Sequence, residues 1–115
     1  MSDRMVKVIV KRVGLAPTVE KISDSLESLQ ELVHGYIESI YLDGAVGVIL
    51  NEEGKLLQLP ENTKLLTAEG LPFDYLVGDL LVFEIGRNNE LTDISESNEK
   101  KYLAQLNAGG LIMVR

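Results

Sequence analysis

One histidine and a scatter of acidic, amide and tyrosine side chains are the residues of this chain that could do chemistry. His34 could act as a general base, because an imidazole titrates near neutral pH. That role needs a hydroxyl or carboxyl partner in space, and a single histidine with scattered serines defines no Ser-His-Asp set. A histidine in the last turn of a helix, facing the negative end of its dipole, is the simpler interpretation. We therefore assign no catalytic residue and expect the chain not to be an enzyme.

Carboxylates are the other chemical candidates. Asp74, Asp79 and Glu84 could approach one another across a sheet and hold a hard cation. Such spacing also arises by chance in an acidic chain, so we expect no metal site. The absence of cysteine excludes disulfides and thiolate zinc sites. No Walker A pattern and no dinucleotide fingerprint occurs, so we expect no cofactor.

Polar residues at the expected ends of helices, strands and turns form the best candidate binding set. Pockets form at such edges, where a few polar groups fix a ligand against apolar walls. In the alternative interpretation the tyrosines cover the core and the asparagines satisfy turns, so that the set serves architecture alone. The candidate ligand-binding or partner-binding residues are Tyr36, Glu38, Tyr41, Asn51, Asn62 and Asp79.

The first elements that must position these residues are a hairpin and a helix. Residues 5–13 are rich in β-branched side chains and predict a strand, which pairs with residues 18–22 across the "GLAP" turn. The next segment predicts a helix with Asp24 as its N-cap and Glu27 completing a capping box. Gly35 suits the left-handed residue that ends the helix.

Further elements follow from the same patterns. Residues 36–59 predict a three-stranded meander, with turns at "DG" and "NEEGK" and with "LLQL" as its last strand. Residues 60–79 are punctuated by proline and glycine and are expected to be rich in loops. The remaining expected elements are a buried strand in "DLLVFEI", a helix in "NEKKYLAQL" and a possible last strand in the tail, residues 107–115.

The order of these elements predicts an α+β fold. We expect one domain over residues 1–115, with a mainly antiparallel sheet of about five or six strands and two helices that cover one face. The formal net charge of −7 disfavours direct binding of nucleic acid, which needs cationic contacts to phosphates. No apolar run is long enough to span a membrane, and the lack of cysteine suits a reducing compartment, so we expect a cytoplasmic protein.

Several short motifs, taken in order, resemble the DUF3846 family. They are "LQELVHGYIE" at 29–38, "NEEGK" at 51–55, "LPEN" at 59–62, "VGD" at 77–79 and "KKYL" at 100–103. The resemblance covers about residues 5–106, and it leads us to expect glycine where this chain has His34. It implies small proteins of phages, plasmids and conjugative elements of Gram-positive bacteria, and it implies no reaction.

Three functional hypotheses follow. The first is a non-enzymatic binding or regulatory protein of a mobile element, with a protein partner such as a host or defence protein. The second is a domain that binds, and sequesters, a small ligand or nucleotide, through a pocket lined by Tyr36, Tyr41 and Asn51 or Asn62. The third is an acidic mimic of DNA, which would need carboxylates spaced like phosphates on one face.

Overall fold

Nearly continuous apolar runs in three central strands build the middle of the fold, because these strands are buried on both faces. The computed structural model describes residues 4–114. Its helices are α1 (Leu26–Val33) and α2 (Glu96–Asn107). Its strands are β1 (Met5–Lys11), β2 (Thr18–Ser23), β3 (Ile37–Tyr41), β4 (Val46–Asn51), β5 (Glu61–Leu66), β6 (Pro72–Val77), β7 (Leu80–Ile85), β8 (Leu91–Thr92) and β9 (Gly110–Ile112).

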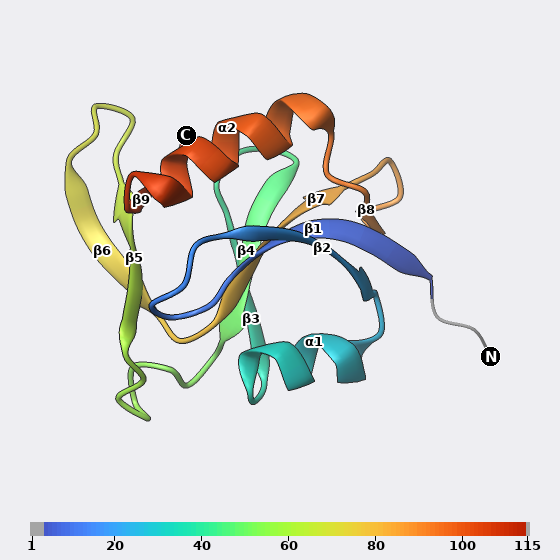
Figure 1. Cartoon of the computed structure of the whole chain (residues 1–115), viewed down its shortest axis with the longest axis horizontal. Coiled ribbons are helices and arrows are strands. Elements are labelled where there is room, and N and C mark those ends of the chain that lie inside the picture. Colours follow the sequence, from blue (N-terminus) through green and yellow to red (C-terminus); the bar gives the residue numbers. More distant parts are fainter. Residues whose placement is uncertain (1–3, 115) are drawn as a thin grey trace.

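The strands form two sheets (Figure 1). The larger sheet has the order β2-β1-β7-β4-β3, with β8 paired to β7, and all its pairs are antiparallel. The smaller sheet has the order β6-β5-β9, in which β5 and β9 run parallel. The predicted α+β class with two helices and a mainly antiparallel sheet is confirmed, and the β1–β2 hairpin and the β3–β4 pair are present.

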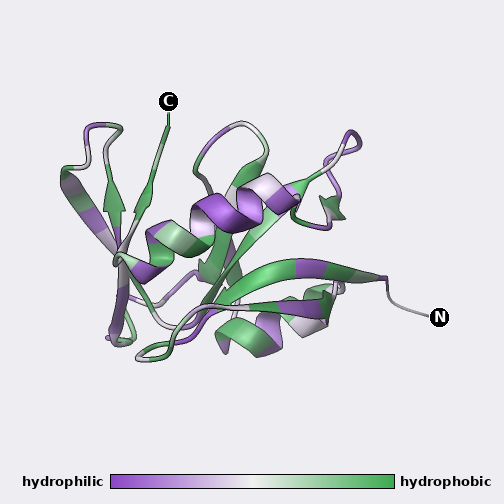
Figure 2. Ribbon diagram, turned by 45° about the horizontal axis from the view of Figure 1, so that its top comes forward, coloured by the Kyte–Doolittle hydropathy of each residue, from purple (hydrophilic) through white to green (hydrophobic). Residues whose placement is uncertain are grey.

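Each face of the larger sheet has its own apolar cluster. Side chains that alternate along a strand point to opposite faces, so Leu81 packs with the α1 side while Val82 packs with the α2 side. The cluster under α2 also contains Leu65 and Leu76 of the smaller sheet. The helices therefore lie on opposite faces of the sheet, and the expectation that both cover one face is wrong. In Figure 2 the apolar colour follows the central strands, while α2 alternates between polar and apolar stretches.

The ends of α1 differ from their predicted positions by one residue each. Ser25, not Asp24, is the N-cap, and its side chain accepts a hydrogen bond from the Ser28 N–H. At the other end His34, not Gly35, is the left-handed residue, with φ 65°. Gly35 is needed for a different reason, since a Cβ there would lie 2.7 Å from Nδ2 of Asn51.

Residues 56–79 are the part of the chain that the sequence patterns described least well. The segment "LLQL" forms a turn rather than a third meander strand, and Gln58 in it has a positive φ of 56°. The region expected to be loops instead supplies β5 and β6, which pair with a register shift at each end. The first four residues of β6, an edge strand, are all exposed, so the strand shows no alternation of buried and exposed residues.

The C-terminal region behaves as predicted. α2 buries Tyr102 and Leu106 against the larger sheet, and the tail contributes the short strand β9. The Tyr102 hydroxyl donates a hydrogen bond to Asp43 Oδ2 at 3.1 Å, which ties α2 to the turn between β3 and β4. Burial and the nearby Asp43 carboxylate raise the pKa of Tyr102 far above its ordinary value.

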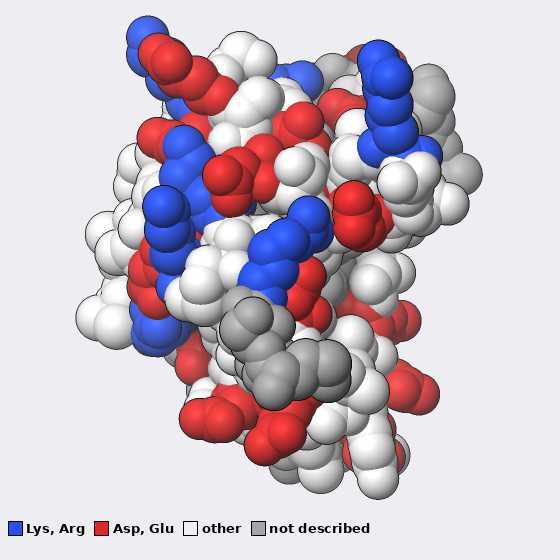
Figure 3. All heavy atoms as spheres, turned by 90° about the vertical axis from the view of Figure 1, so that its right-hand side faces the viewer, with Lys and Arg blue, Asp and Glu red and all other residues white. Residues whose placement is uncertain are grey.

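Charges of both signs are interleaved on the face shown in Figure 3. Ion pairs join several elements of the structure: Arg4 contacts Asp24, Lys7 contacts Glu99, and Arg12 contacts Glu20. The Arg12–Glu20 pair is bidentate, and its hydrogen bonds lower the pKa of Glu20 and raise that of Arg12. A face of mixed sign lacks the continuous row of carboxylates that imitation of a DNA backbone would require.

Candidate functional site

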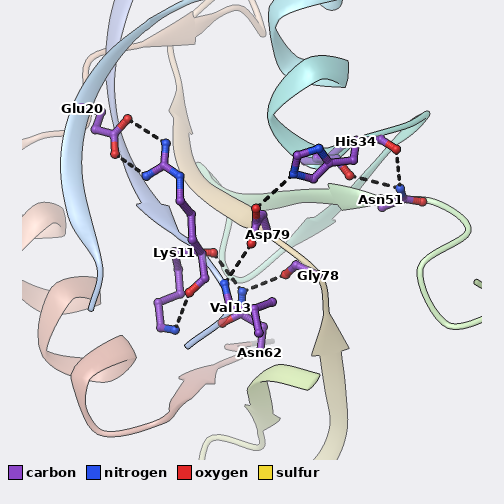
Figure 4. Close-up of polar contacts among 10 residues, drawn as sticks. Lys11, Val13, Glu20, His34, Asn51, Asn62, Gly78 and Asp79 are labelled. Atoms are coloured by element: carbon purple, nitrogen blue, oxygen red, sulfur yellow. Dashed lines mark hydrogen bonds and ion pairs between the residues drawn. The ribbon is translucent and has the colours of Figure 1, made fainter. Parts of the chain in front are cut away.

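Asn51 has a structural role at the end of α1. Its side-chain amide donates to the carbonyl oxygens of Val33 and His34, at 3.1 and 3.3 Å (Figure 4). Its Oδ1 accepts a hydrogen bond from the Glu53 N–H at 2.8 Å. The side chain is buried, and these bonds satisfy orphan carbonyls of the helix. Asn51 thus joins the end of α1 to the turn after β4. This contact agrees with the alternative interpretation in which the asparagine satisfies a turn.

Asn62 and Asp79 hold neighbouring chain segments together. The Asn62 amide donates to the carbonyl oxygens of Lys11 and Gly78, at 2.9 and 2.8 Å (Figure 4). Asp79 Oδ1 accepts from the Val13 N–H at 2.9 Å. Both side chains therefore fix the turn after β1 to the β6–β7 connection.

The second oxygen of Asp79 contacts the only histidine of the chain. His34 Nε2 lies 3.1 Å from Asp79 Oδ2 (Figure 4). This pair borders an open depression of about 300 Å³, which Ser28 and Glu20 also line. No hydrogen bond joins Ser28 to His34 among the described residues, and the His34 side chain is 67% exposed. The depression therefore brings together the side-chain types of a catalytic triad without the nucleophile-to-base contact that activates a serine.

The three carboxylates considered for a metal lie in separate environments. Asp74 pairs with Lys55, Asp79 contacts His34, and Glu84 accepts hydrogen bonds from the Ser95 N–H and the Asn98 amide. Within residues 4–114, no cluster of three or more histidine or carboxylate side chains could hold a metal ion.

A groove lies between β3 and β6. We name it the β3–β6 groove; it has a volume of about 250 Å³. Its apolar walls come from β3, β4, β6 and the turn that follows β4, and charged side chains stand at its rim. The apolar wall residues include Ile40, Leu50, Leu56, Leu76 and Val77, and the charged residues are Glu38, Glu52, Lys55 and Asp74.

Lys55 organises one side of the groove. Its ammonium group lies 2.6 Å from Asp74 Oδ1 and 4.7 Å from the centre of the Tyr75 ring. The hydrogen bond to Asp74 raises the pKa of Lys55 and lowers the pKa of Asp74. Lys55 therefore lies against Asp74 and the aromatic face, and after the hydrogen bond to Asp74 the negative charge of Glu38 also helps to raise its pKa. No direct ion pair joins Glu38 or Glu52 to a lysine or arginine among the described residues.

The predicted binding residues fall into three places. Glu38 and Asn51 line the β3–β6 groove. Tyr36 is 66% exposed just before β3, and Tyr41 lies on the other face of β3, with its ring edge-on to Phe83 at 5.7 Å. Asn62 lies in β5 and Asp79 in the β6–β7 connection, and neither residue lines the groove.

Lys55 and Tyr75 of the groove are not among the predicted binding residues, and Asp74 is predicted only as a possible cation ligand. The punctuation of residues 60–79 by proline and glycine predicts loops and obscures the alternation of Phe73 and Tyr75 along an edge strand. That alternation was the available signal, because two aromatic residues two positions apart share one side of a strand.

Exposed apolar side chains lie beside the groove. Leu56 is 78% exposed, Phe73 53% and Tyr75 46%. Leu56 and Tyr75 line the groove, and Phe73 and Tyr75 together line a neighbouring shallow hollow, so the three are continuous with it. We name these three residues the docking patch.

Comparison with known proteins settles the family. The family described as "Domain of unknown function (DUF3846)" matches residues 6–107. The chain belongs to the DUF3846 family. The match spans nearly all of this DUF3846 protein, in agreement with the resemblance expected over about residues 5–106. Among curated proteins and among solved structures, none matches the chain significantly.

The structure also bears on the membrane question. Neither helix in residues 4–114 has both the length and the apolar character needed to cross a bilayer.

Proposed function

We propose that this DUF3846 protein is a non-enzymatic binding domain that recognises another protein through the docking patch and the β3–β6 groove. The single observation that carries the proposal is the exposure of Leu56, Phe73 and Tyr75 beside a charged groove. Large apolar side chains at the surface cost solvation unless a partner covers them, and aromatic residues are frequent anchors in protein interfaces.

The setting of this binding is taken from the family resemblance. We propose that the protein serves a mobile genetic element and regulates a host or defence protein. The polar residues support a non-enzymatic role, because Asn51, Asn62 and Asp79 are occupied in holding chain segments together.

The size of the groove favours a protein partner over a nucleotide. Its volume of about 250 Å³ lies below the 300–1,000 Å³ that is typical of ligand pockets. A groove of this size accommodates one side chain of a partner, with its stem on the apolar wall and its head at the charged rim.

The proposal is tested by affinity capture from an extract of the natural host, with wild-type protein and a Leu56→Ser, Phe73→Ser double variant. We expect a specific partner that the wild type retains and the double variant loses. The matched control is Leu15→Ser, which also removes an exposed leucine (60% exposed) but lies in the turn after β1. Equal capture by all three proteins would show that the docking patch is not the binding surface.

A further inference from the structure

The outer edge of β3 carries backbone groups that no described strand uses. β3 is the last strand of the larger sheet and pairs only with β4. At its two ends, the Glu52 N–H donates to the Tyr36 carbonyl and the Leu42 N–H donates to the Val46 carbonyl. Hydrogen-bonded and non-hydrogen-bonded positions alternate in an antiparallel pair, so Glu38 and Ile40 also bond to β4. The N–H and C=O groups of Ile37, Ser39 and Tyr41 therefore point away from the sheet.

The other long edges of the two sheets are protected. The β2 edge presents Lys21 at its centre, and charged lysines discourage the addition of another strand. The β6 edge begins with Pro72 and has register shifts, and the Asp74 carboxylate already accepts a hydrogen bond from the Tyr75 N–H at 2.7 Å. β3 has neither proline nor lysine nor a register shift.

A hollow lies beside β3. It has a volume of about 510 Å³ and is lined by Ser39, Ile40 and Tyr41 of β3 together with Asp43, Met113 and Val114. The Val114 N–H donates to the Leu42 carbonyl, so the end of the described chain reaches one end of this edge. Ser39 and Tyr41 are exposed, which leaves their side of β3 accessible.

The charges near this edge select the chemistry of the occupant. Glu38 lies on β3, and its side chain lines the β3–β6 groove together with Glu52. Lys55, the cation of the groove, is already paired with Asp74. A strand that carries lysine or arginine at alternate positions could place one of them over the groove, beside the carboxylates of Glu38 and Glu52, neither of which forms a direct ion pair among the described residues.

We propose that the partner adds a basic extended segment to the edge of β3, with its backbone bonded to Ile37, Ser39 and Tyr41 and a basic side chain in the β3–β6 groove. This inference rests on the proposed function, because it names the kind of protein segment that the same surface takes. A second copy of this chain fits less well, since the net charge of −7 and Glu38 would place like charges together.

The probe for this inference is a short capped peptide of alternating lysine and valine, titrated into the isotope-labelled protein and followed by NMR. We expect the peptide to shift the Ser39 and Tyr41 amide signals and to slow the hydrogen exchange of both. Ser39→Pro removes the outward N–H and is expected to weaken binding about tenfold, the effect of losing one or two hydrogen bonds. Ser39→Ala is the matched control, because it keeps the backbone donor.

The charge of the occupant is tested separately. Glu38→Gln with Glu52→Gln is expected to weaken the lysine peptide about tenfold and to leave an alternating threonine and valine peptide unaffected. Absence of binding by the lysine peptide, or protection of the Ser39 and Tyr41 amides by self-association in the free protein, would overturn the inference.

The outcome also separates this inference from the proposed function. Peptide binding that shifts Phe73 and Tyr75 but leaves the Ser39 amide unchanged would overturn strand addition and leave the docking patch intact. Loss of partner capture in the Leu56→Ser, Phe73→Ser variant speaks only to the proposed function. If Ser39→Pro does not fold, the amide protection in the wild-type protein still decides the question.

Discussion

At the scale of single residues, the polar side chains that attract attention in the sequence mostly hold chain segments together. Asn51, Asn62 and Asp79 each contact backbone groups of distant segments, and His34 has a backbone role as the left-handed residue after α1. Their residue types were visible in the sequence. Their partners were not, because each bond joins segments that the fold, rather than the local sequence, brings together.

The strain at His34 leads to the first prediction. A left-handed conformation costs an ordinary residue about 1–2 kcal/mol, and the cost is greatest for β-branched side chains. His34→Gly should unfold at the same denaturant concentration as the wild type or at a higher one, because relief of strain offsets loss of the exposed contact with Asp79. His34→Val should be less stable than His34→Gly by about 1–2 kcal/mol. Equal stability of the two variants in urea melts would mean that position 34 is not left-handed in solution.

The environment of Asp43 predicts how the stability of the protein changes at acidic pH. Burial alone would raise its pKa, but hydrogen bonds from the Ala45 and Val46 N–H groups and from Tyr102 outweigh burial, and the pKa is lowered. A lowered pKa in the folded state stabilises the protein above the unfolded-state value of about 4, and this contribution is lost as pH falls through the folded value. The free energy of unfolding should therefore fall below about pH 4.

The contribution of Asp43 can be separated from that of other carboxylates. Glu20 and Asp74 also have lowered pKa values and contribute in the same direction. Asp43→Asn should reduce the slope of stability against pH below about pH 4 without abolishing it. An unchanged slope in chemical denaturation at several pH values would show that Asp43 is not stabilised as a carboxylate.

At the scale of elements, the junction between α1 and β3 depends on the close approach of Gly35 to Asn51. A Cβ at position 35 would lie 2.7 Å from Asn51 Nδ2, whereas a Cβ at Gly44 would meet nothing within 4 Å. Gly35→Ala should lower the free energy of unfolding by about 1–3 kcal/mol, because the amide that satisfies the helix end must move. Gly44→Ala is the control and should change stability by less than about 0.5 kcal/mol.

The elements with strong local signals were predictable from the sequence. The β1–β2 hairpin, the β3–β4 pair, β7 and α2 all follow apolar periodicity and turn residues. β5 and β6 were not predicted, since proline and glycine residues punctuate residues 60–79 and β5 is completed by β9 from far along the chain. The β6 side of the β3–β6 groove could therefore not be predicted from the sequence either.

At the scale of the whole molecule, the two sheets share the apolar cluster under α2, and the β3–β6 groove, with its apolar walls and charged residues, lies between them. The β3–β6 groove lies between the docking patch and the open edge of β3. The chain belongs to the DUF3846 family, and the family description names no activity. The proposed binding of a basic strand therefore requires that the outer edge of β3 is free to pair.

Residue-resolved amide hydrogen exchange on the free protein tests most directly whether the outer edge of β3 is unpaired. If the edge is free, exchange rates should alternate along β3. Exchange should be slow at Glu38 and Ile40, whose N–H groups bond to β4, and about a hundredfold or more faster at Ser39 and Tyr41. Uniformly slow exchange from Ile37 to Tyr41 would contradict this prediction, because the outer edge of β3 would then already be occupied.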